Sequence, residues 1–222
     1  MKKAVALFLA VMMAFCSMSC GLMPSNEDPN AQQYADFATG LLDAIFREDF
    51  TAYREMTGES ETAVQRLYDN NVANTADEIK NHFGLRFMTT EDKEVLHEVV
   101  GKVYSKIRYT VTSTAQDENG AYVVTIDLGI MDFLDLVQKD LDAYVDEMNQ
   151  KMVNRELDNL STDEYDLLLK DEAVKIMQAR VDNTAANEHI SVQLPFKMGA
   201  DGSATITTDT LHMVSQKLLH LN

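Results

Sequence analysis

Residues 107–128 read IRYTVTSTAQDENGAYVVTIDL, and this stretch decides the fold. Apolar and polar side chains alternate along both of its halves, which is the pattern of strands that bury one face. The Asn119-Gly120 pair between the halves is a strong signal for a hairpin turn. The stretch therefore predicts an antiparallel β-hairpin. Its inward residues are Ile107, Tyr109, Val111, Tyr122, Val124, Ile126 and Leu128.

Apolar residues at helical spacing precede this hairpin. They predict one helix from Tyr34 to Ile45 that ends near residues 47–50, a second over 59–83 and a third that starts after Thr90. Gly84 follows the second helix at a position where a left-handed cap is common. The N-terminal part of the fold is therefore expected to be helical.

A second set of elements follows the hairpin. Residues 133–157 carry an apolar stripe at helical spacing, and Ser161 with Glu164 makes the Ser-x-x-Glu capping pair that opens a further helix. Strand alternation returns at 189–196 and 203–208, around a turn at 199–202, and residues 210–219 predict a closing helix. This order predicts an α+β fold with a helical hairpin, residues 133–181, inserted between two strand pairs.

The N-terminus has the features of an export signal. Lys2 and Lys3 form a short positive region, and residues 4–15 carry no charge. This apolar stretch is shorter than the ~20 residues that span a bilayer, so we interpret residues 1–19 as a signal peptide and not as a buried N-terminal helix.

The segment Ser17-Met18-Ser19-Cys20-Gly21 resembles the bacterial lipobox, in which small residues precede a cysteine that becomes lipidated. Ser17 departs from this pattern, because an aliphatic residue is usual there. Cys16 fits less well, since Phe15 precedes it. The resemblance implies cleavage before Cys20 and a lipid anchor on its thiol, and the alternative is ordinary cleavage without lipid. Both place the chain outside the cytoplasm, facing the extracellular side or the periplasm.

The remaining chain is predicted to be a lipidated tether, residues 20–33, and one α+β domain, residues 34–222, which includes the 133–181 insertion. Cys16 and Cys20 are the only cysteines, so no intrachain disulfide can form after cleavage.

The chain is strongly acidic, with 36 Asp and Glu against 19 Lys and Arg and a net charge of −17. Such a field repels phosphate backbones, so nucleic acid is excluded as a partner. It also repels anionic headgroups, so contact with a membrane is expected through the lipid. The charge serves solubility, or alternatively attracts a cationic partner or a divalent cation.

The stretch Phe37–Tyr53, FATGLLDAIFREDFTAY, resembles the opening helix of small Firmicutes lipoproteins with nuclear-transport-factor-two-like, or cystatin-like, domains. The resemblance rests on an amphipathic helix that ends in a charged-Asp-aromatic turn, here Arg47-Glu48-Asp49-Phe50. It implies that the N-terminal helices pack on a curved, antiparallel four-stranded sheet, which encloses a conical pocket. The 133–181 insertion departs from the compact form of that fold, and many members have no known function.

No catalytic or metal-binding signature is present. The five histidines, His82, His97, His189, His212 and His220, fall in no zinc-binding spacing, and no nucleophile elbow, Walker loop or GxGxxG occurs. The run Asp117–Gly120 lacks the ligand pattern of an EF-hand and reads as a turn. We therefore expect no catalytic residue, no metal and no cofactor.

Two sets of side chains are candidates for binding. Tyr34, Tyr109 and Tyr122 are candidate pocket-lining residues, with core packing as the alternative. The hairpin methionines Met148, Met152 and Met177 form either an adaptable partner surface or helix–helix core. The sequence favours a non-catalytic module of the cell envelope that binds a protein or a small molecule. The alternative is an envelope hydrolase that uses carboxylates in a conical pocket.

Overall fold

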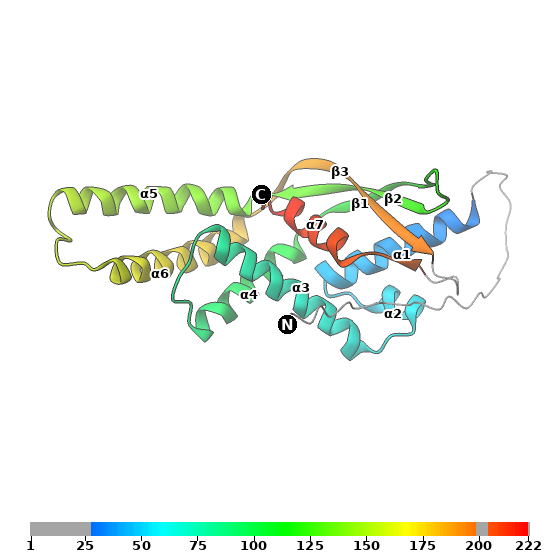
Figure 1. Ribbon diagram of the computed structural model, residues 1–222, viewed down its shortest axis with the longest axis horizontal. Helices are drawn as coiled ribbons and strands as arrows, with labels where there is room; N and C mark the ends of the chain where they lie inside the picture. Colours follow the sequence, from blue (N-terminus) through cyan, green and yellow to red (C-terminus); the bar gives the residue numbers. More distant parts are fainter. Residues whose placement is uncertain (1–27, 199–203, 222) are drawn as a thin grey trace. The chain divides into compact units, whose positions relative to one another are not determined.

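The computed structural model describes residues 28–198 and 204–221 of the 222-residue chain. Within them, seven α-helices accompany a four-stranded sheet with the strand order β1-β2-β3-β4 (Figure 1). The chain divides into two compact units. Unit 1 holds the described residues up to 68 with 109–128 and 190–215, and unit 2 holds 69–108, 129–189 and the remaining C-terminal residues. The predicted boundaries of a single domain stay a prediction.

Unit 1 begins with helix α1, Pro29–Phe46. Asp28 caps it by accepting a hydrogen bond from the Asn30 N–H, which supplies a partner for an otherwise unpaired donor. The helix therefore starts before Tyr34, where the apolar repeat begins. It includes the last residues of the predicted tether, and residues 20–27 of that tether lie outside the described part. Its apolar face is buried, and the predicted end near residues 47–50 is confirmed. The short helix α2, Thr51–Thr57, was not predicted.

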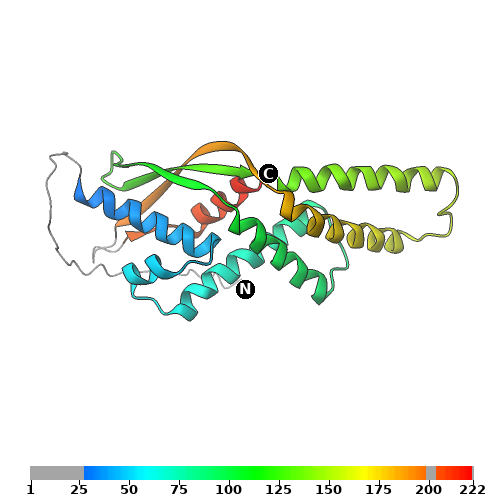
Figure 2. The same ribbon diagram turned by 180° about the vertical axis from the view of Figure 1, so that it is seen from behind.

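The predicted hairpin is confirmed as β1, Tyr109–Gln116, and β2, Tyr122–Met131. Its register pairs Tyr109 with Leu128 and Gln116 with Tyr122, with a bulge after Val111. Gly120 has a φ of 78°, the left-handed conformation that glycine adopts most easily. Helix α1 lies along this hairpin (Figure 2), and β2 buries alternate residues against it and the rest of the core.

The second strand pair comprises β3, Ala186–Met198, and β4, Ala204–Thr205. Val192, Leu194 and Phe196 are buried in alternation, as predicted. β4 is shorter than the predicted 203–208 strand, and helix α7, Thr208–Leu218, begins at the residue where that strand was expected to end. The predicted turn at 199–202 lies outside the described residues.

Unit 2 contains the C-terminal part of α3, Glu61–His82, and all of α4, Thr90–Ser105. Thr89 and Asp92 form a capping box at the start of α4. A buried hydrogen bond of 2.6 Å between the Thr75 and Tyr104 hydroxyls joins the two helices. Gly84 follows α3 with a φ of 62°, which confirms the predicted left-handed position.

The predicted helical hairpin is the second part of unit 2 and consists of α5, Phe133–Val153, and α6, Thr162–Arg180 (Figure 1). A 3-10 turn, Val181–Asn183, follows α6. α5 ends four residues before the predicted Leu157, and Arg155 just beyond it has a φ of 63°. The Ser161–Glu164 capping box is present. The α+β class and the helical hairpin between two antiparallel strand pairs are thus confirmed.

Candidate functional site

The structure brings two of the three candidate pocket tyrosines together. Tyr34 of α1 and Tyr122 of β2 are each 2% exposed, and their rings stack with centroids 4.2 Å apart. Phe196 of β3 packs beside Tyr34, with ring centroids 5.9 Å apart. These rings pack on one another as core side chains, which agrees with the alternative reading of core packing. Their role in lining a pocket stays a prediction.

Tyr109 belongs to a separate polar cluster in unit 1. Its hydroxyl donates a hydrogen bond of 2.5 Å to Oδ1 of Asp43 on α1. The Arg47 guanidinium lies 2.9 Å from the same oxygen and 4.6 Å from the centre of the Tyr109 ring. Burial, together with the neighbouring Asp43 carboxylate, raises the pKa of Tyr109, so the phenol keeps its proton and its hydrogen bond to Asp43 into the alkaline range. The cluster fastens β1 to α1.

The carboxylates do not support the hydrolase alternative. Among the described residues, every Asp or Glu with a shifted pKa has that pKa lowered: Asp28, Asp92, Asp117, Asp140 and Glu164. A general acid in a glycosidase or acid protease requires the opposite shift. These five groups cap helices, close a turn or form ion pairs, and they come from different elements.

The histidines are dispersed. All five are exposed and lie in α3, in α4, in β3, in α7 and just beyond α7. In the part of the chain that the structure describes, no group of three or more His, Cys, Asp or Glu side chains could hold a metal ion.

The root of the α5–α6 hairpin is held by polar contacts within unit 2. The Arg180 guanidinium on α6 pairs with both carboxylate oxygens of Asp140 on α5, at 2.5 and 2.8 Å. Lys106 Nζ donates to the carbonyls of Val181 and Asp182 at 2.6 and 2.7 Å. These bonds fix the point where α6 ends, so they also fix how the two hairpin helices lie against each other.

Exposed apolar side chains gather in this unit. Among the described residues, the large hydrophobic side chains with the greatest exposure are Phe87, Met152, Val153, Leu167 and Leu168, which we name the hairpin group. All five belong to unit 2. Single exposed apolar residues are ordinary on protein surfaces, so it is the gathering of five in one unit that makes this region a candidate site.

The chain path explains why these residues share one end of the hairpin. Met152 and Val153 are the last two residues of α5, and Leu167 and Leu168 lie within two turns of the start of α6. Residues 154–161 join the two helices, so both pairs lie near this connection (Figure 1). Arg86 binds Asp166 at 2.9 Å and stacks on Phe87, which brings Phe87 beside the same part of α6.

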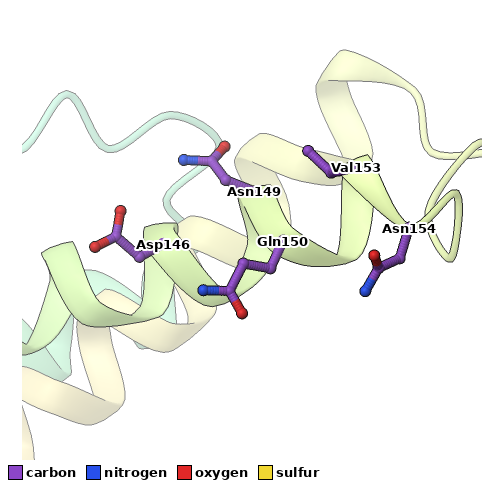
Figure 3. Close-up of a pocket in the computed structure, with 5 residues that line it drawn as sticks. All are labelled: Asp146, Asn149, Gln150, Val153 and Asn154. Carbon is purple, nitrogen blue, oxygen red and sulfur yellow. The ribbon is translucent and has the colours of Figure 1, made fainter.

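A shallow hollow of about 500 Å³ lies on α5 at this end (Figure 3). Its lining residues, Asp146, Asn149, Gln150, Val153 and Asn154, share one helix face because they are spaced three or four positions apart. One methyl-bearing side chain thus stands among three amides and a carboxylate. Such a mixed surface suits contact with another protein, where apolar groups give affinity and amides give hydrogen bonds.

The methionine prediction separates into two parts. Met148 and Met177 are 4% and 1% exposed and form helix–helix core, whereas Met152 is 41% exposed and belongs to the hairpin group. Phe87, Val153, Leu167 and Leu168 were not predicted from the sequence. A signal for two of them exists: three consecutive leucines, 167–169, cannot all face one side of a helix that turns by about 100° per residue.

None of the helices in the described residues combines the length and the apolar character that crossing a membrane requires.

Comparison with known proteins gives a likeness of fold. No protein-family model matches the chain, and no curated protein matches it. The crystal structure of YcdA from Bacillus subtilis, a candidate lipoprotein, is similar with a TM-score of 0.53 at 12% sequence identity. The match covers 83% of this chain and 55% of YcdA, so the chain spans about half the length of that structure. The nuclear-transport-factor-two-like resemblance and its curved sheet stay predictions.

Proposed function

We propose that this chain is an envelope lipoprotein, held to a membrane through lipid on Cys20, whose described part is a non-catalytic module that binds a protein partner. The observation that carries the binding role is the gathering of exposed apolar side chains at one end of the α5–α6 hairpin. Large apolar side chains that are exposed to water lower solubility, and contact with a partner would remove them from water.

Two observations support the anchor. The lipobox-like segment ends at Cys20, and the fold is similar to that of YcdA, which is itself a candidate lipoprotein. Two acyl chains on one cysteine give stable membrane binding, because each buried CH₂ contributes ~0.8 kcal/mol. Cys20 and the leader lie outside the described residues, so the anchor rests on the sequence and on this likeness.

The anchor is tested by Cys20→Ala in bacterial cells that are fed an alkyne-tagged fatty acid. The wild-type protein should carry the tag and sediment with membranes, and the variant should lose the tag. Cys16→Ala is the matched control and should keep it. A variant that is still tagged, or a wild-type protein that is never tagged, would overturn the anchoring.

The binding role is tested in the same cells with a photo-crosslinking amino acid at position 168. A discrete adduct should form there and should be absent when the probe replaces Glu55, an exposed residue of α2 in unit 1. Equal adducts from both positions would show that the hairpin end has no special partner.

A further inference from the structure

We propose that the hairpin group docks on a protein surface whose apolar side chains are flanked by Lys and Arg, and not on a lipid surface or on a second copy of this chain. The inference rests on the proposed binding function and adds the chemistry of the partner. It follows from the charges that surround the exposed apolar side chains.

The surroundings of the hairpin group are acidic. Residues 146–168 contain seven acidic side chains and two basic ones. One of the two, Lys151, is already paired with Glu147 at 2.6 Å. Asp146, Asp158 and Asp163 are exposed. They lie near the C-terminus of α5, in the connecting segment and at the N-terminus of α6, respectively. A partner that makes an apolar contact here therefore places the residues around its own apolar contact surface against negative charge.

This charge selects among possible occupants. A second copy would place one acidic end against another, on chains that each carry a net charge of −17, and like-charge contacts cost several kcal/mol. An anionic membrane surface is repelled for the same reason. A partner with basic residues around an apolar centre satisfies both parts of the surface, because apolar burial supplies affinity and charge complementarity supplies orientation and a fast on-rate.

The geometry also limits the partner's shape. The exposed side chains stand on two helices and one adjoining loop, beside a hollow on α5 that is open to solvent and not enclosed. An open surface of this kind accepts the side of a helix or a flat protein face better than a small molecule, which needs an enclosed site.

The test uses the full-length protein in detergent and a synthetic amphipathic helix with a leucine face flanked by lysines. A second peptide carries glutamates in place of the lysines. Binding is measured by fluorescence anisotropy of labelled peptide. The lysine peptide should bind, should weaken several-fold when salt is raised from about 50 to 300 mM, and should bind far better than the glutamate peptide.

Variants locate the binding surface. The four-fold variant Met152→Gln, Val153→Gln, Leu167→Gln and Leu168→Gln keeps the charge and the helical tendency, and should weaken binding by about tenfold or more. The matched control, Ala143→Gln with Ala179→Gln, changes exposed positions nearer the hairpin root and should bind as wild type does. A third, charge variant, Asp146→Asn with Asp158→Asn and Asp163→Asn, should lose about threefold in affinity and part of the salt dependence.

Circular dichroism and thermal melting show whether each variant is folded. If the four-fold variant does not fold, the charge variant and the peptide pair still decide the outcome. Equal binding of both peptides, or unchanged binding by the folded four-fold variant, would overturn the proposal. Absence of any binding would overturn it as well.

Two further measurements test the rejected occupants. Sedimentation that reveals a wild-type dimer absent from the four-fold variant would assign the surface to a second copy. Protein anchored in one set of vesicles should not cluster a second, protein-free set made of phosphatidylglycerol and phosphatidylethanolamine; clustering that depends on the four residues would assign it to lipid. Peptide binding in detergent does not depend on lipid at Cys20. A failure of this proposal can therefore be distinguished from a failure of the proposed anchoring.

Discussion

Lys170 Nζ lies 2.7 Å from Oδ2 of Asp92, and the same carboxylate oxygen accepts the N–H of Thr89 at the start of α4. The lysine side chain is 6% exposed and that of Asp92 is 17% exposed. Asp171 supplies a second carboxylate 2.5 Å from the same ammonium. One buried cation on α6 thus completes the cap of α4, which ties the hairpin to the neighbouring helices of unit 2.

Replacing this lysine should destabilise the protein measurably. Lys170→Met keeps much of the side-chain volume but leaves Asp92 largely buried without its cation, so we expect a loss of about 2 kcal/mol in the free energy of unfolding. Lys175→Met is the control, because Lys175 is 69% exposed and its pair with Glu172 should contribute under about 0.5 kcal/mol. Urea unfolding at pH 7 measures both, and equal losses would contradict the assignment.

The same pair predicts a dependence on acid. Burial acts to raise the pKa of Asp92, but the hydrogen bonds from Lys170 and Thr89 outweigh it and hold that pKa below its ordinary value. A carboxyl whose pKa is lower in the folded state stabilises the fold above its unfolded pKa of about 4 and loses that effect as the pH falls further. Unfolding measured from pH 6 to pH 3 should therefore show a smaller acid-induced loss for Lys170→Met than for the wild type.

Unfolding at alkaline pH tests the role of Tyr109. Its pKa is raised by burial and by Asp43, so its protonated form stabilises the fold below about pH 10 and the effect is lost as the pH rises further. Tyr109→Phe removes the 2.5 Å hydrogen bond and should cost about 1–2 kcal/mol at pH 7. It should also unfold less steeply between pH 9 and pH 11. An alkaline unfolding curve parallel to that of the wild type would show that Tyr109 is not responsible.

Close packing at Gly129 gives a fourth prediction. A Cβ added there would lie 2.8 Å from Ala186 Cβ and 3.3 Å from the Arg108 carbonyl oxygen. Gly129→Ala should therefore destabilise the protein by about 1–3 kcal/mol. Adding Ala186→Gly removes the nearer clash, so the double variant should be more stable than the two separate losses predict. A coupling energy near zero in this double-mutant cycle would contradict the contact.

Much of the fold was predictable because local chemistry and tertiary packing agree. The Asn119-Gly120 turn, the alternation of Val192, Leu194 and Phe196, and the Ser161–Glu164 cap each specify a local structure that the rest of the chain then uses. Helix ends were less predictable. α1 starts early because a single Asp28 cap outweighs the polar character of the residues after it.

The candidate site was less predictable than the fold. Periodicity identifies the side of a helix that faces the core, but it does not reveal which apolar residues lie outside that stripe and stay exposed. Met148 and Met152 are one helical turn apart, yet Met148 is buried and Met152 is 41% exposed where α5 ends. Phe87 is brought to this end with the Arg86–Asp166 ion pair, which joins residues 80 positions apart and has no signal in the sequence.

That difference between the methionines is directly measurable by oxidation. Hydrogen peroxide converts a thioether to a sulfoxide at a rate that follows the exposure of the sulfur. Met152 should therefore react well before Met148 and Met177, which are 4% and 1% exposed. Peptide mass spectrometry over a time course gives the three rates on the same sample. Similar rates would mean that the hairpin opens on the timescale of the reaction, or that Met148 is not core.

The oxidised protein then serves as a second probe of the hairpin group. A sulfoxide at position 152 makes one of the exposed apolar groups polar and leaves the acidic rim and the folded core unchanged. Mildly oxidised protein should therefore bind the lysine-flanked peptide more weakly, by about threefold, while its thermal unfolding stays at the wild-type temperature. Met152→Leu is the matched variant, because it keeps an apolar side chain that peroxide cannot modify. If oxidation weakens binding by this variant as much as it does by the wild type, the sensitive methionine lies elsewhere.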